Sequence, residues 1–151
     1  MAKIRRMDHV SINVEDMDAA KEFFLMLGME VAGEAKVGGA QVGRIIGLAD
    51  PMSDVVFLRT PDGHSQIELV KHLAAPDKDG PRAPASNRLG LIHIAFEVEG
   101  LTALLAELRA KGYATVGTVE NFEDVYLLCF LRGPEGIIVE LAEDISPKHG
   151  S

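Results

Sequence analysis

The sequence predicts an α+β fold made of two tandem β-α-β-β-β modules. Segments of alternating apolar residues predict strands, apolar stripes that end at glycine predict helices, and the whole order occurs twice. The chain has 151 residues, of which 47% are apolar and 25% are charged, as in an ordinary soluble domain. We expect a single domain over residues 5–145, made of module 1 (5–72), a linker (73–87) and module 2 (88–145).

The first module begins with a strand and a helix. Residues 7–14 alternate between apolar and polar side chains, which is typical of a half-buried strand. Asp16 can cap a helix, and apolar residues then recur at helical spacing as far as Gly28. A helix of about three turns should therefore follow the first strand.

The rest of the first module predicts strands around one short helical piece. Extended character resumes over residues 29–35, and a glycine-rich loop with a helical piece over 42–48 follows. Residues 53–60 and 65–71 flank Pro61-Asp62-Gly63, a turn signature between two apolar runs. These two runs predict a hairpin.

The second module follows a linker and has the same order. Residues 73–87 are rich in Ala, Pro, Asp, Lys and Gly, which is linker composition. Residues 89–98 alternate as a strand, and a leucine stripe beginning at Leu101 ends at Gly112. Three further strands are expected over 113–119, 125–132 and 137–142.

The repetition indicates an internal duplication. A shift of 84 residues places His9 on His93 and Gly28 on Gly112. The ends of the modules also correspond, because Arg-Thr-Pro-Asp-Gly at 59–63 matches Arg-Gly-Pro-Glu-Gly at 132–136.

The two modules differ in register by one residue near their ends. Glu68 lies five residues after Gly63, whereas Glu140 lies four residues after Gly136. A bulge or a longer turn in the first hairpin would absorb the extra residue.

The duplication yields an early-strand histidine and a late-strand glutamate in each module. All four side chains have the parity opposite to the apolar residues that pack against a helix, so we expect them to share one face. Buried imidazoles and carboxylates need a cationic partner, and a divalent metal ion would satisfy them. Zn, Ni, Co, Mn and Fe(II) suit mixed nitrogen and oxygen ligands, and a six-coordinate ion would keep two positions for water or substrate. The predicted metal ligands are His9, Glu68, His93 and Glu140.

Other assignments stay open at this stage. A single strand histidine is more often a hydrogen-bonded structural residue than a ligand, and the argument depends on the repeat. His64 shares the parity of Glu68 and could replace it as a ligand. In a helix, His64, Glu68 and His72 would lie on one face, but the preceding turn and the β-branched neighbours favour a strand.

Charge and cysteine content restrict the partners and the compartment. Fifteen basic against 23 acidic residues give a net charge of −8, and the basic residues are scattered, which disfavours nucleic acid. No apolar run is long enough to span a membrane, and the first residues lack the apolar region of a signal peptide. The single cysteine, Cys129, allows no intramolecular disulfide and is expected to pack as a small apolar residue. We expect a cytoplasmic protein without a membrane partner.

The repeated strand openings and the ending resemble a known superfamily. Met-Asp-His-Val-Ser-Ile-Asn-Val at 7–14, Leu-Ile-His-Ile-Ala-Phe-Glu-Val at 91–98 and Gly-Pro-Glu-Gly-Ile-Ile-Val-Glu-Leu at 133–141 are similar to the vicinal oxygen chelate superfamily, which includes glyoxalase I, methylmalonyl-CoA epimerase, extradiol dioxygenases and bleomycin resistance proteins. The resemblance implies two modules that form an incomplete barrel around a central cavity with a divalent metal ion. It also implies a homodimer and a small-molecule substrate.

The metal-ligand pattern most resembles bacterial glyoxalase I and methylmalonyl-CoA epimerase, although epimerases typically have Gln in place of Glu68. The resemblance assigns His9, Glu68, His93 and Glu140 as ligands, with Glu140 or Glu68 as the catalytic base. It implies a lyase or isomerase that chelates vicinal oxygens of a small carbonyl or thioester substrate and promotes proton abstraction. Whether glutathione, coenzyme A or neither is part of that substrate stays open.

Two other activities remain as alternatives. An Fe(II)-dependent extradiol-type dioxygenase would keep the fold, and Tyr126 could then assist an oxygen-derived anion. A non-catalytic antibiotic- or metabolite-binding protein would only sequester its ligand. The insertion over residues 38–50 and the long linker differ from a compact bacterial glyoxalase I. Candidate anchors for an anionic substrate are Arg44, Arg59, Lys71, Arg88 and Arg132.

Overall fold

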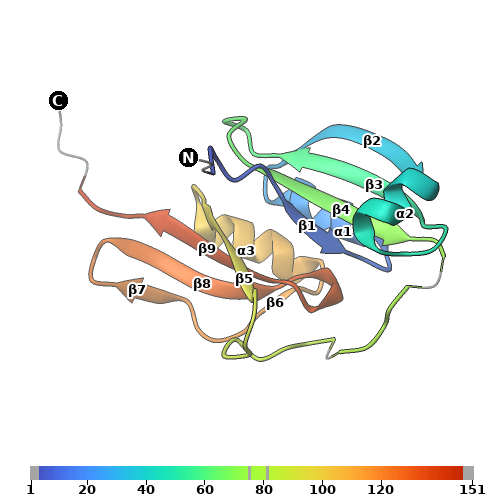
Figure 1. The fold of residues 1–151 in the computed structure, drawn as a ribbon. Coiled ribbons are helices and arrows are strands. Elements are labelled where there is room, and N and C mark those ends of the chain that lie inside the picture. The colour runs from blue at the N-terminus through green and yellow to red at the C-terminus, as the bar shows by residue number, and fades with distance from the viewer. Residues whose placement is uncertain (1–3, 75, 81, 148–151) are drawn as a thin grey trace. The chain divides into compact units, whose positions relative to one another are not determined.

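The computed structural model describes residues 4–74, 76–80 and 82–147. The chain divides into two compact units, unit 1 (Met1–Gly80) and unit 2 (Pro81–Ser151), drawn from blue to green and from green to red in Figure 1. Each unit is an α+β structure with its own sheet, as the duplicated pattern predicts. In the described part of the chain, no helix has the length and apolar character needed to cross a membrane.

Unit 1 contains a four-stranded sheet and two helices. Its elements are β1 (Val10–Asn13), α1 (Met17–Met26), β2 (Glu30–Gly38), α2 (Ala40–Ile46), β3 (Met52–Arg59) and β4 (Gln66–His72). The strand order is β1-β4-β3-β2, with β1 parallel to β4 and the other pairs antiparallel. The first and last strands of the unit are therefore neighbours.

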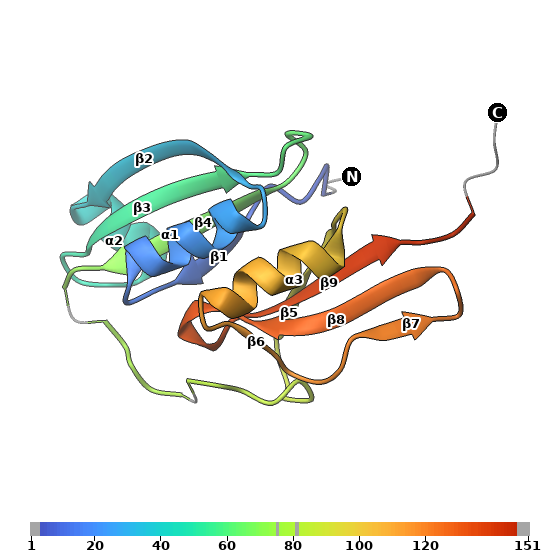
Figure 2. The same cartoon turned by 180° about the vertical axis from the view of Figure 1, so that it is seen from behind.

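Helix α1 forms where the sequence predicts it and covers one face of this sheet. The carboxylate of Asp16 accepts a hydrogen bond from the Ala19 amide at 3.0 Å and caps the helix. Phe23 and Phe24 are fully buried against the sheet, as is Leu69 of β4. Figure 2 shows α1 in front of this sheet, running roughly along β4. The apolar parity of β4 thus faces the helix, and Glu68 has the opposite parity.

Unit 2 repeats the arrangement with one helix. Its elements are β5 (His93–Glu97), α3 (Leu101–Ala110), β6 (Ala114–Thr115), β7 (Glu120–Phe122), β8 (Tyr126–Arg132), a 3-10 turn (Pro134–Gly136) and β9 (Ile138–Asp144). The strand order is β5-β9-β8-β6, β7 also pairs with β8, and β5 is parallel to β9. The first and last strands are again neighbours.

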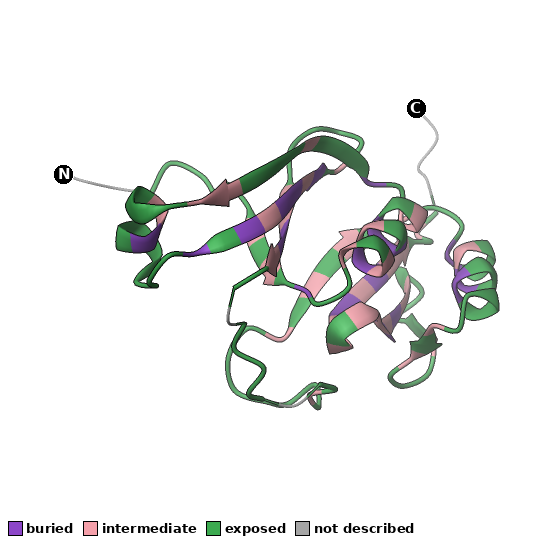
Figure 3. Ribbon diagram, turned by 90° about the vertical axis from the view of Figure 1, so that its right-hand side faces the viewer, coloured by how far each residue is buried: buried purple, intermediate pink, exposed green. Residues whose placement is uncertain are grey.

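The core of unit 2 lies between α3 and its sheet. Leu101 and Leu108 of the helix are fully buried, as are Val139 and Leu141 of β9. Figure 3 shows that buried residues concentrate on strands and helix stripes, whereas the described linker residues are mostly exposed. Helix α3 has no side-chain cap of its own. Instead, the carboxylate of Glu143 on β9 accepts hydrogen bonds from the amides of Gly100 at 2.7 Å and Leu101 at 3.0 Å.

Two strand predictions in unit 2 are wrong in extent. The strand expected over 113–119 is reduced to Ala114–Thr115, and the short β7 was not expected. All three residues of β7 are exposed, so no apolar alternation marks this strand. A turn follows it, in which the Asn121 side chain accepts from the Asp124 amide. The strand expected over 89–98 begins only at His93, because Leu89 and Leu91 lie outside the sheet and are exposed.

The one-residue difference between the modules lies in the hairpin turn. Residues 60–65 connect β3 to β4, whereas the shorter stretch 133–137 connects β8 to β9. Pairing between β3 and β4 is regular, and the bulge of this sheet lies between Val31 and Gly33 of β2. A longer turn therefore absorbs the extra residue.

The end of the linker is attached to unit 2. The Arg132 guanidinium donates to the Pro84 carbonyl at 3.0 Å and to the Gly136 carbonyl at 3.1 Å. A Cβ atom on Gly136 would lie 1.8 Å from the Arg82 carbonyl oxygen. The linker therefore passes directly over the β8–β9 turn.

Candidate metal centre

The first and last strands of unit 1 bring His9 and Glu68 together. Val10 pairs with Ile67 and Ser11 with Glu68 in the parallel β1–β4 ladder. His9 immediately precedes β1, and its Nε2 atom lies 3.4 Å from Oε2 of Glu68. These two predicted ligands are thus adjacent on the sheet face opposite to α1.

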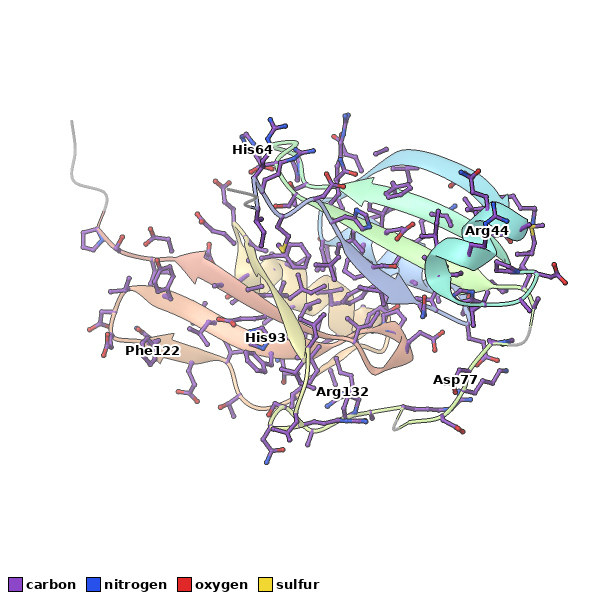
Figure 4. All side chains as sticks on the ribbon, in the orientation of Figure 1. Arg44, His64, Asp77, His93, Phe122 and Arg132 are labelled. Atoms are coloured by element: carbon purple, nitrogen blue, oxygen red, sulfur yellow. The ribbon has the colours of Figure 1, made fainter. Side chains whose placement is uncertain are left out.

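Unit 2 forms the same pair from equivalent strands. Ala95 of β5 pairs with Glu140 of β9, again in a parallel ladder. Nε2 of His93 lies 3.3 Å from Oε2 of Glu140. Figure 4 labels His93 at the start of β5. The duplication therefore yields two similar histidine–glutamate pairs, one in each unit.

Each pair also has a phenylalanine beside its histidine. Phe57 lies opposite Glu68 in the β3–β4 ladder, and its ring meets that of His9 edge-on at 5.8 Å between centroids. Phe130 lies opposite Glu140, with its ring centroid 4.8 Å from that of His93. Sequence reasoning missed both phenylalanines. The sequence contained a signal for them, because Phe57 lies two residues before Arg59 and Phe130 lies two residues before Arg132. The two phenylalanines therefore occupy equivalent positions in the repeat.

The donor distances within the pairs suit metal ligation. Separations of 3.3 and 3.4 Å exceed the usual N–H···O hydrogen-bond length of about 2.9–3.0 Å. Two ligands of one ion, each about 2.1 Å from it, lie about 3.0 Å apart in octahedral geometry and about 3.4 Å apart in tetrahedral geometry. The nitrogen and oxygen donors also suit the divalent metals expected from the sequence.

Neither unit by itself completes a metal site. Within residues 4–74, 76–80 and 82–147, no cluster of three or more His, Cys, Asp or Glu side chains is arranged to hold an ion. Both pairs remain partly exposed, with 34% of the His9 side chain and 35% of the His93 side chain accessible. Each pair thus offers one nitrogen and one oxygen donor, and we call it a half-site of the metal centre proposed below.

The histidine of unit 1 has a further carboxylate partner. Nδ1 of His9 lies 2.9 Å from Oδ2 of Asp8, and Arg6 donates to the other oxygen of Asp8 at 2.8 Å. The hydrogen bond from His9, together with the charge of Arg6, lowers the pKa of the Asp8 carboxyl. Asp8 is thus a carboxylate that can only accept, so His9 donates through Nδ1.

His64 and His72 do not join the pair in unit 1. Residues 66–72 form a strand, so the helical alignment of His64, Glu68 and His72 is wrong. His64 lies in the exposed turn before β4, as Figure 4 shows, where its amide donates to the Asp62 side chain at 3.0 Å. His72 lies at the other end of β4, with its Nδ1 atom 3.1 Å from the buried Ser53 hydroxyl.

Cys129 and Tyr126 lie away from the pair in unit 2. Cys129 is 1% exposed, and burial raises the pKa of its thiol, which is the behaviour of a packed apolar residue. Tyr126 is four residues from Phe130 along β8, a distance of about 13 Å at the usual strand rise. It therefore does not reach the site next to Glu140.

Two of the basic residues considered as substrate anchors have partners in the structure. Arg59 forms an ion pair with Glu30 at 3.2 Å, and Arg132 holds the linker as described above. Arg44, labelled in Figure 4, is an exposed residue of α2.

Comparisons with known proteins identify the family. The family model for the Glyoxalase/Bleomycin resistance protein/Dioxygenase superfamily matches residues 8–130. A glyoxalase family protein from Bacillus cereus is 39% identical, with a TM-score of 0.92 over 96% of this chain and 97% of its own. A trypanothione-dependent glyoxalase I from Leishmania major shares the fold at 22% identity, with a TM-score of 0.66 over 93% of this chain and 87% of its own.

A curated relative is the mitochondrial methylmalonyl-CoA epimerase of Mus musculus, which is 26% identical over 109 residues. This match covers 72% of the chain and 54% of the epimerase, so the chain spans about half the length of that relative. The family match, the strand order and the repeated half-sites agree with one another. The chain therefore belongs to the Glyoxalase/Bleomycin resistance protein/Dioxygenase superfamily, also called the vicinal oxygen chelate superfamily.

Proposed function

We propose that the protein is a divalent-metal-dependent lyase or isomerase of the glyoxalase or epimerase type. The observation that carries the proposal is the repeated histidine–glutamate pair, with Nε2–Oε2 separations of 3.4 and 3.3 Å. All four side chains would serve one ion per chain, namely those of His9, Glu68, His93 and Glu140. The similarity to methylmalonyl-CoA epimerase and to glyoxalase family proteins supports this class of reaction.

The chemistry follows from the donor set. A bound Zn, Ni, Co, Mn or Fe(II) ion would stabilise negative charge on the vicinal oxygens of a small carbonyl or thioester substrate. Glu140 or Glu68 would accept the proton from the carbon next to that carbonyl, because a carboxylate is a suitable base within hydrogen-bond reach. Delivering a proton to the opposite face of the same carbon gives epimerisation, and delivering it to the neighbouring carbon gives isomerisation. A histidine nitrogen that binds the ion has no lone pair left for a proton, so the glutamates, each with a second carboxylate oxygen, are the members of the set able to accept one.

Metal content tests the first part of the proposal. Protein purified without an affinity tag should contain about one equivalent of a divalent metal by elemental analysis. His93→Ala should lose most of it, and Glu97→Gln should retain it. Glu97 is a suitable control because it lies on the same strand as His93, with the same parity, at the other end of β5, where it pairs with Ala142. Near-zero metal in the unmodified protein would overturn the proposal.

Proton exchange tests the reaction. We expect metal-dependent incorporation of deuterium from D2O at the α carbon of methylmalonyl-CoA or of the hemithioacetal of methylglyoxal and glutathione. If Glu140 is the base, Glu140→Gln should lose this exchange. If Glu68 is the base, Glu68→Gln should lose it. If neither substrate class exchanges, oxygen uptake with catechols would support the dioxygenase alternative. Stoichiometric ligand binding that survives His9→Ala and Glu140→Ala would instead support a sequestering protein.

The proposal includes a homodimer, because members of the superfamily often dimerise. Light scattering coupled to size-exclusion chromatography should give twice the chain mass of 16.3 kDa. A mass of one chain would contradict this part without affecting the metal site.

A further inference from the structure

The two half-sites differ in what holds the histidine ring. His9 has an aspartate at the preceding position, and its Nδ1 atom lies 2.9 Å from that carboxylate. The equivalent position before His93 is Ile92, which has no polar side chain. Arg6, which holds the other oxygen of Asp8, likewise corresponds to Gly90. The chain thus contains one histidine with a carboxylate partner and, in the repeated module, a matched histidine without that aspartate.

This difference fixes which nitrogen of His9 is available. A neutral imidazole carries one proton, and the nitrogen that lacks it is the one that can bind a metal. Nδ1 lies at hydrogen-bond distance from the Asp8 carboxylate, 2.9 Å, whereas Nε2 is farther from the Glu68 carboxylate, so the geometry favours the proton of a neutral His9 on Nδ1. The lone pair is then on Nε2, the atom that lies 3.4 Å from Glu68. His9 is therefore oriented as a ligand before any ion arrives.

We propose that Asp8 is a positioning residue that makes the His9–Glu68 pair the tighter half of the metal site. The inference rests on the proposed metal-dependent function and goes beyond it, because it assigns unequal contributions to the two pairs. A carboxylate that accepts from the second nitrogen of a ligating histidine orients the ring and raises its basicity. Losing such a partner typically weakens metal binding about 10–100-fold.

The simpler alternative is that Asp8 only forms a surface ion pair with Arg6. Its side chain is 64% exposed, and exposed ion pairs contribute little to stability. The two views predict different results, because a surface ion pair has no effect on the tautomer of His9 or on the affinity for a metal ion. The tests below therefore use these two readouts.

The first experiment measures the tautomer in the metal-free protein. Nitrogen-15 NMR at about pH 8, well above the ordinary histidine pKa of ~6.5, should show His9 protonated on Nδ1. Asp8→Ala should shift His9 towards the Nε2-protonated form that histidine favours in water, and Asp8→Asn, which keeps an acceptor oxygen, should shift it less. Asp77→Asn, which removes an exposed linker carboxylate, should leave His9 unchanged. An unchanged His9 spectrum in Asp8→Ala would overturn the proposal.

The second experiment measures affinity for Zn²⁺ by competition with a chromophoric chelator. Asp8→Ala should weaken binding about 10–100-fold, whereas Arg6→Gln, which leaves the His9–Asp8 contact in place, should change it less than Asp8→Ala. His93→Ala/Glu140→Ala, which keeps the unit 1 pair, should retain tighter residual binding than His9→Ala/Glu68→Ala. Equal residual affinities of the two double variants would contradict the asymmetry.

Failure of the proposed function gives a different result. If the unmodified protein does not bind Zn²⁺ or any other divalent metal, the metal-dependent function is wrong, and the proposed role of Asp8 fails with it. If the unmodified protein binds metal and Asp8→Ala binds it equally well, only the positioning role is wrong.

Discussion

Phe57 and Phe130 occupy the same place in their units, each directly across the ladder from the glutamate of its half-site and beside the paired histidine. The β3–β4 and β8–β9 hairpins thus support the pairs from the side opposite to the first strands. In each half-site, the histidine lies at or directly before the start of the first strand, the glutamate on the last strand and the phenylalanine on the strand between the last strand and the rest of the sheet. An aromatic ring against an imidazole limits the orientations that the imidazole can adopt.

Removing either ring should loosen its half-site. We expect Phe57→Ala and Phe130→Ala each to lower the free energy of unfolding by about 2 kcal/mol, less than for a fully buried phenylalanine, and to weaken Zn²⁺ binding. Urea denaturation and chelator competition measure the two effects. Phe122→Ala is a suitable control because this ring is 54% exposed on β7. A control that lost as much metal affinity as the two test variants would contradict the role of the rings.

The Glu143 cap predicts a loss of stability in unit 2. Glu143→Ala leaves the amides of Gly100 and Leu101 without their carboxylate acceptor, so we expect a loss of about 1 kcal/mol, as for other helix N-caps. Glu143→Gln keeps one acceptor oxygen and should cost less. Chemical denaturation checks the order. If Glu143→Gln and Glu143→Ala are both neutral, the cap does not stabilise α3.

The contribution of the contact between the linker and the β8–β9 turn can be measured by comparing alanine substitutions of two glycines at equivalent turns. Gly63 and Gly136 have φ values of +73° and +75°, so alanine should strain either backbone by roughly 1 kcal/mol. A Cβ at Gly63 meets nothing within 4 Å, whereas one at Gly136 overlaps Arg82. Gly136→Ala should therefore cost more than Gly63→Ala and speed tryptic cleavage after Arg82. Equal cleavage rates would show that the linker is not held there.

The turn between β3 and β4 predicts a pH-dependent contribution to stability. Hydrogen bonds from the Thr60 hydroxyl and the His64 amide lower the pKa of Asp62 below its ordinary value of 3.8. A depressed pKa in the folded state means that the stabilisation is present above the unfolded-state pKa and is lost as pH falls through the folded-state pKa. The stability difference between the unmodified protein and Asp62→Ala should therefore be constant near neutral pH and shrink in acid. Denaturation curves over this pH range measure it, and a difference that grew in acid would contradict the assignment.

Much of the fold follows from sequence because the apolar pattern and the turn residues agree. Asp16, Gly28 and Pro61-Asp62-Gly63 mark the ends of elements in unit 1 by local chemistry alone. The strand β7 could not be predicted, since its three exposed residues gain their structure from pairing with β8. Such a strand leaves no pattern in its own residues.

The candidate site, too, could be predicted from the sequence only in part. Parity and duplication predicted that the histidines and glutamates lie on the face away from the helices. The separations of 3.4 and 3.3 Å within each unit depend in addition on the pairing of its first and last strands, which was not predicted. The contribution of Asp8 was not predicted, because it depends on a side-chain hydrogen bond rather than on strand periodicity. The use of all four residues by one ion stays a prediction.

The parallel pairing of the first and last strands also has a consequence for folding. His9 and Glu68 come from opposite ends of unit 1, and His93 and Glu140 from opposite ends of the β-α-β-β-β order in unit 2. Pairing of β1 with β4, or of β5 with β9, joins residues that are far apart in the sequence of the unit. Contacts between such distant residues form slowly during folding. A nascent chain that has not yet produced β4 or β9 has the histidine of the corresponding unit without its paired glutamate. Capture of metal by a pair would then report that its unit has finished folding.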